Sequence, residues 1–108
     1  MGILFTVIAS GSALTDAVDL SHCHLCTVFV PGIDSADLLV QANFDPRSAG
    51  FARVQNAPPA GDDVRFPTAT GSKVLLWPGE PPLLPFLKLE TSAPQADTRT
   101  FTLLTSRL

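Results

Sequence analysis

Charge is scarce in this chain of 108 residues. Charged side chains make up 16% of it and apolar ones 45%, whereas charged residues usually account for roughly 25% of a soluble domain. A chain of this length is expected to form one domain, residues 1–108, whose high ratio of surface to volume leaves apolar area outside the core. We therefore expect a permanent partner or a second copy to cover that area. An ordinary monomer with a Thr-rich β surface is the alternative.

Basic residues are especially few. The formal net charge is −3, and the two lysines and five arginines are scattered. No basic patch is available to neutralise a row of phosphates, which argues against nucleic acid binding and against electrostatic anchoring at a membrane. No apolar run approaches the ~20 residues of a transmembrane helix. We therefore expect neither nucleic acid nor membrane as a partner.

The first residues combine an apolar run with small residues. Residues 1–9 and the Ser-Gly-Ser-Ala that follows loosely imitate a signal peptide, but no Lys or Arg precedes the run. The start also fits the M-G-x-x-x-T pattern of N-myristoylation. A first buried strand accounts for the run better than either, and it is the prediction here.

Short apolar and β-branched runs alternate with clusters of Pro, Gly, Asp and Asn along the chain. Within residues 86–91, Leu87 and Leu89 should point inward and Lys88 and Glu90 outward, which is the period of a half-buried strand. The predicted strands are residues 3–9, 13–24, 26–30, 37–44, 51–55, 73–77, 86–91 and 99–106.

About eight short antiparallel strands separated by turns predict an all-β fold, a single jelly-roll-like β-sandwich. Residues 99–106 should place Phe101 and Leu103 inward. Residues 34–42 could instead form a capped helix of two turns. The alternating polarity of residues 37–44, together with the β-branched Val40, favours a strand.

Cysteine and histidine occur only within one short segment, which reads His22, Cys23, His24, Leu25 and Cys26. A structural zinc site needs four ligands, usually as two separated pairs, and the chain has no second pair. In an extended strand the two cysteines lie roughly 10 Å apart, too far for a disulfide. No helix follows to lower a thiol pKa as in a redox C-x-x-C motif. We expect no metal site here.

No catalytic motif is present either. The chain has no G-x-S-x-G elbow, P-loop or G-x-G-x-x-G, and the acidic pair Asp62 and Asp63 lies in a loop rich in Pro and Gly, where solvated turn residues are usual. We therefore predict no catalytic, cofactor-binding or metal-binding residue, and no enzyme. Trp77 is the only Trp and there is no Tyr, so Trp77 is the candidate for contact with a glycan, although a Trp next to Pro78 more often closes the end of a core.

Five segments follow the layout of a known group of short β-sandwich proteins. They are V-D-L-S at residues 18–21, T-V-F-V-P at 27–31, A-D-L-L-V-Q-A-N-F-D at 36–45, P-F-L-K-L-E-T-S at 85–92 and Q-A-D-T-R-T-F-T-L at 95–103. Over residues 18–104 the chain thus resembles virion accessory proteins of tailed phages and prophages, of the head decoration or cement type. It departs from them at Asp45-Pro46, where the group has Asp-Gly, and in its His–Cys segment.

The resemblance implies a virion component with a jelly-roll-like fold. Such a protein is made in the host cytoplasm, lies on the outer surface of the phage head as a dimer or trimer, and bridges subunits of the major capsid protein. Residues 3–9 and 100–104 are expected to support these contacts, with turns at Pro31-Gly32, Pro58-Pro59 and residues 78–82 as the rim. A tail or fibre module that binds host glycans is the alternative.

Overall fold

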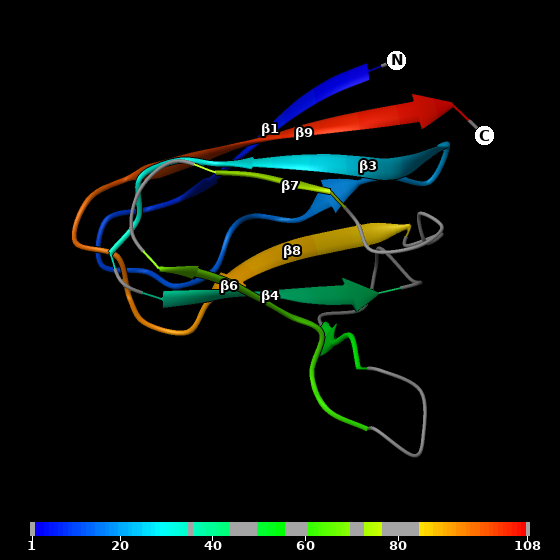
Figure 1. Ribbon diagram of the computed structural model, residues 1–108. Coiled ribbons are helices and arrows are strands. Elements are labelled where there is room, and N and C mark those ends of the chain that lie inside the picture. Colours follow the sequence, from blue (N-terminus) through cyan, green and yellow to red (C-terminus); the bar gives the residue numbers. More distant parts are fainter. Residues whose placement is uncertain are drawn as a thin grey trace.

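The chain forms two antiparallel β-sheets that face each other. The computed structural model describes residues 2–34, 36–43, 50–55, 61–69, 73–76 and 85–107. None of these residues is helical. Figure 1 shows the two sheets as layers, with the N- and C-termini of the chain at the same end of the sandwich. The all-β prediction is confirmed, and residues 36–43 are a strand, not a helix.

Sheet A, the upper layer in Figure 1, has the strand order β1-β9-β3-β7. Its strands are β1 (Gly2–Ile8), β9 (Arg99–Arg107), β3 (Cys23–Val30) and β7 (Lys73–Leu76). The first and last strands of the chain pair along the whole of β1, from Gly2 opposite Thr105 to Ile8 opposite Arg99. The two apolar segments expected to support contacts are therefore neighbours in one sheet.

Sheet B has the order β2-β8-β4-β5, and β6 pairs with β4 beside this path. Its strands are β2 (Val18–Asp19), β8 (Phe86–Thr91), β4 (Ala36–Asn43), β5 (Ala52–Arg53) and β6 (Arg65–Ala69). Strand β5 lies within the predicted strand at residues 51–55, and it pairs with Gln41 and Ala42 of β4.

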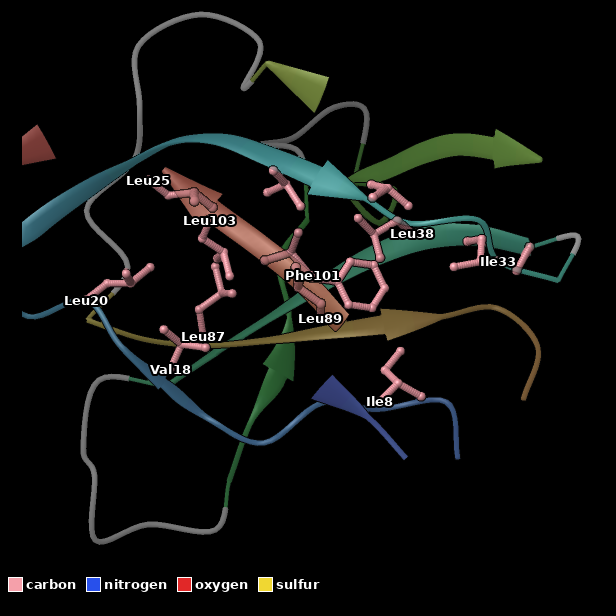
Figure 2. Close-up of a cluster of buried hydrophobic side chains, with 14 residues drawn as sticks. Ile8, Val18, Leu20, Leu25, Ile33, Leu38, Leu87, Leu89, Phe101 and Leu103 are labelled. Carbon is pink, nitrogen blue, oxygen red and sulfur yellow. The ribbon is translucent and has the colours of Figure 1, made fainter. Parts of the chain in front are cut away.

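The hydrophobic core lies between the sheets, and the alternating strands supply most of it. Leu87 and Leu89 of β8 and Phe101 and Leu103 of β9 are fully buried, as predicted. Figure 2 shows these side chains pointing toward one another, with Phe101 near the centre. The full cluster comprises Ile8, Val18, Leu20, Leu25, Val28, Val30, Ile33, Ala36, Leu38, Val40, Leu87, Leu89, Phe101 and Leu103.

The first strand differs from its prediction. It was expected to be a buried strand, yet Ile3, Phe5 and Val7 are exposed, and only Thr6 and Ile8 are fully inside. The reason is the two-layer architecture, because β1, like β9 and β3, turns only one side toward the core. The sequence does not reveal which side of β1 is exposed, because apolar side chains lie on both of its faces.

Two other predictions were wrong in their extent. Residues 13–24 form only the short strand β2 and two isolated bridges, Ile8 with Thr15 and Leu14 with Glu90, before β3 begins at Cys23. Strand β6 was not predicted; it contains Pro67, which cannot donate to a ladder. The proline is tolerated because β6 pairs only with β4 and so lies at an edge.

Candidate interaction surface

The large apolar side chains that are exposed all lie on one face. Among the described residues they are Ile3 (58% exposed), Phe5 (67%), Val7 (38%) and Phe29 (43%). All four belong to strands of sheet A and point away from sheet B, because their neighbours along each strand point into the core. We call this side of β1, β9 and β3 the apolar face; its members are Ile3, Phe5, Val7, Thr27, Phe29, Thr100, Thr102 and Leu104.

Strand register sets the apolar side chains in rows across the sheet. Thr102 of β9 pairs with Phe5 on one side and with Phe29 on the other, so that one row holds two phenyl rings flanking a threonine. The next row along the sheet begins with Ile3 beside Leu104. Cross-strand neighbours of this kind contact one another, and the rows therefore form one continuous patch.

Charge is absent from this patch. Strand β1 has no ionisable side chain, and the charged residues of β9 are only its end residues, Arg99 and Arg107. Arg99 is engaged elsewhere, because its guanidinium lies 3.2 Å from Asp34. The threonines between the apolar groups provide hydroxyls that can exchange hydrogen bonds with a partner at little desolvation cost.

The outer side of sheet B has the opposite character. The Arg53 guanidinium donates to both carboxylate oxygens of Glu90, at 3.0 and 2.7 Å, and to Asp63 at 3.2 Å. Gln41 donates to the same Glu90 carboxylate at 2.9 Å. These hydrogen bonds, that from Arg53 above all, hold the pKa of Glu90 below its usual value, and the two carboxylates raise the pKa of Arg53.

Further charged contacts extend the same network. Arg65 donates to Asp37 at 2.7 Å, and the Lys88 ammonium lies 4.6 Å from the ring centroid of Phe51. Charged groups on sheet B therefore satisfy one another and meet water. The two outer faces differ so strongly that only the apolar face has the composition of an interface core.

The His–Cys segment is divided between a turn and strand β3. His22 lies in a turn, and the ladder between β3 and β9 shifts between Leu25 and Thr27, so that Cys26 is an extra residue in β3. Its thiol lies 3.5 Å from the Ser106 hydroxyl, while Cys23 packs against the core. Both cysteines are free thiols, and no three potential ligands among the described residues come together around a metal position.

The other segments noted in the sequence serve as structure or lie outside the described residues. Asp63 is paired with Arg53, and Pro31-Gly32 ends β3 at one end of the sandwich. Trp77, Pro58-Pro59 and residues 78–82 lie outside the described residues. The expected rim is therefore placed only at Pro31-Gly32.

One buried residue organises the loops at this end and was missed by sequence reasoning. Gln95, 1% exposed, accepts a hydrogen bond from the Asp34 backbone N–H at 2.7 Å and donates to the Ala93 carbonyl at 3.1 Å. Its own backbone bonds to Ser12 and Gly11 in the loop after β1. Gln95 thereby joins three loops and fixes where β1 and β9 leave the sheet. No feature of the sequence marked it, because the three loops meet only in the folded chain.

Comparisons with known proteins identify no relative, so the proposal below is argued from the two outer surfaces. No known protein family, no curated protein and no solved structure matches the chain. In the part of the chain that is described, no helix has the length and apolar character needed to cross a membrane.

Proposed function

We propose that this protein is a non-enzymatic assembly protein that binds its partner through the apolar face. The observation that carries the proposal is the segregation of the two outer surfaces. Every large exposed apolar side chain of the described residues lies on sheet A, and a charged network covers sheet B. Uncharged patches rich in aromatic side chains are typical of interface cores.

The resemblance described above suggests the setting. We propose a capsid decoration or cement protein on the outer surface of a phage head, with the major capsid protein as partner and with no cofactor, nucleic acid or membrane involved. The strand order supports a jelly-roll type of sandwich, since strands alternate between the sheets along the chain except at β4, β5 and β6, which follow one another in sheet B, and β1 pairs with β9.

A bridging protein stabilises a shell by mass action, because it binds the assembled lattice better than the ruptured one. The four exposed apolar side chains together amount to about two fully exposed ones, and burying them contributes roughly 3–6 kcal/mol. Association of two proteins costs an estimated 4–15 kcal/mol. One apolar face alone therefore gives weak binding, and firm attachment needs further contacts or several linked copies.

The test uses phage heads that lack the protein. Wild-type protein should cosediment with such heads and raise the temperature at which they rupture. Phe5→Lys should lose both effects, because it replaces the most exposed large side chain of the apolar face by a charge. The control Gln55→Lys adds the same charge to an exposed residue of the opposite side and should bind normally.

The glycan-binding alternative predicts a different pattern. A tail or fibre module leaves the rupture temperature unchanged and gives a glycan array signal that Trp77→Ala removes. That result, together with failure to bind heads, would contradict the capsid proposal. Equal binding by Phe5→Lys and Gln55→Lys would contradict the assignment of the apolar face.

A further inference from the structure

The free edge of β1 is unusual among the edges of this fold. Strand β1 is seven residues long and contains no proline, no charged residue and no register shift. Other edge strands among the described residues are short or interrupted: β2 and β5 have two residues each, β6 contains Pro67 and β7 begins with Lys73. Natural proteins use such devices to prevent pairing between sheet edges, and β1 lacks all of them.

We propose that two copies of the chain pair through their β1 strands, antiparallel about a two-fold axis at Phe5, so that the two copies of sheet A become one continuous sheet. The occupant of the edge is thus a second copy of the same strand. The inference rests on the proposed function only for what the dimer does, which is to attach to the capsid at two points. The pairing itself can be tested without any capsid.

The sequence of β1 is complementary to itself in this arrangement. With Phe5 opposite Phe5 of the second copy, Ile3 lies opposite Val7 of that copy, and Val7 opposite its Ile3. All these residues belong to the exposed side of β1, so each outward pair is apolar on apolar. Aromatic and β-branched pairs of this kind are the ones that stabilise antiparallel strands. Leu4 and Thr6 pair on the inward side.

The neighbouring loop limits the register. Thr15 forms an isolated bridge with Ile8 and so occupies the edge of β1 at its C-terminal end. No other bridge to that edge is present among the described residues. The Thr6 hydroxyl donates to the Asp16 carbonyl at 3.2 Å on the inward side, so the same loop contacts β1 at Thr6 as well, and the edge is free of this loop from Gly2 to Phe5. An axis at Phe5 uses Ile3 to Val7 and stops before Ile8.

The lack of charge on β1 and the small area that pairing would bury are both consistent with a weakly bound second copy. Because β1 carries no charge, its own side chains do not repel those of a second β1, although the chain has a net charge of −3. Pairing the strands covers on the order of a few hundred Å² of apolar side chain, less than the ~1,200–2,000 Å² of a standard interface. We expect a weak, concentration-dependent dimer, which doubles the apolar face and gives two linked attachments to one lattice.

Cysteine cross-linking tests both the edge and the register. In a Cys23→Ala/Cys26→Ser background, Phe5→Cys should form a covalent dimer under mild oxidation, because directly opposed strand residues have Cα atoms about 4.5–5.5 Å apart, within disulfide range. Ile3→Cys and Val7→Cys should each cross-link poorly alone and efficiently when mixed. If Phe5→Cys stays monomeric while Phe29→Cys cross-links, the copies meet face to face and the inference is wrong.

Sedimentation equilibrium provides a second test without oxidation. Phe5→Lys should weaken dimerisation at least tenfold, because it places two ammonium groups opposite each other. Phe29→Lys, on the same face but on the interior strand β3, should leave dimerisation unchanged. A wild-type chain that is monomeric at all concentrations, or equal losses in both variants, would overturn the pairing. A dimer that fails to bind heads contradicts only the proposed function, and a monomer that binds them contradicts only this inference.

Discussion

Replacing Gln95 with methionine should destabilise the fold far more than its lack of apolar contacts suggests. The change keeps the length of the side chain and removes both polar ends of the amide. The Ala93 carbonyl still accepts from the Thr91 hydroxyl at 2.8 Å, but the Asp34 N–H loses the oxygen that it meets at 2.7 Å. A donor left unsatisfied in a partly buried loop costs about 1–3 kcal/mol.

The loss of that one donor sets the expected magnitude. We expect Gln95→Met to lower the free energy of unfolding by about 2 kcal/mol, which corresponds to roughly 10 °C in melting temperature for a chain of this size. Thermal denaturation followed by circular dichroism measures it. A melting temperature within 2 °C or so of wild type would refute the view that Gln95 holds the loops together.

Gln95→Glu provides the matched control. The carboxyl keeps an acceptor for Asp34 but turns a second oxygen toward the Ala93 carbonyl, where Gln95 has its N–H donor. Burial and this oxygen both disfavour the charged form, so the pKa of the introduced carboxyl is raised in the folded state. Its destabilisation should therefore appear as pH rises above about 4.3, the pKa in the unfolded chain, and it should shrink at lower pH, when the protonated group can donate.

Three further outcomes follow from the same contacts. Phe101→Ala removes a fully buried ring at the centre of the core and should cost about 3–5 kcal/mol in chemical denaturation, whereas Phe5→Ala should change stability by less than about 0.5 kcal/mol. Because the pKa of Glu90 is lowered in the fold, chiefly by Arg53, its contribution is present above about pH 4.3 and is lost as pH falls through the lowered value; the gap in melting temperature between wild type and Glu90→Gln should close on acidification. A chelator should leave the melting temperature unchanged, and a large fall would contradict the absence of a metal site.

Strands in which polarity alternates could be predicted from the sequence. In β8, Leu87 and Leu89 alternate with Lys88 and Glu90, and this contrast specifies which side faces the core. In β1 the contrast is missing, because Ile3 and Phe5 on the outside are as apolar as Ile8 on the inside. Which side of β1 is exposed depends on its pairing with β9 and on the second sheet, both of which involve residues distant in the sequence.

The apolar face was therefore only half predictable. The low charge indicated apolar surface outside the core, and residues 3–9 and 100–104 were expected to support contacts, but residues 3–9 were predicted as a buried strand. Phe29 was not predicted in the face, because it joins the face through pairing with Thr102. Gln95 was missed for a related reason. A buried glutamine is invisible to any scale of hydrophobicity, and its burial follows only from the loops that converge on it.

Side-chain footprinting of the head-bound protein tests the central claim most directly. Free and head-bound protein are labelled with a carbene reagent, and the labelling of each residue is read by mass spectrometry. The account predicts that Phe5 and Phe29 on the apolar face lose most of their labelling in the bound state, while Phe51, which lies under Lys88 in sheet B, is labelled equally in both. Protection of Phe51 with Phe5 and Phe29 still labelled would contradict it.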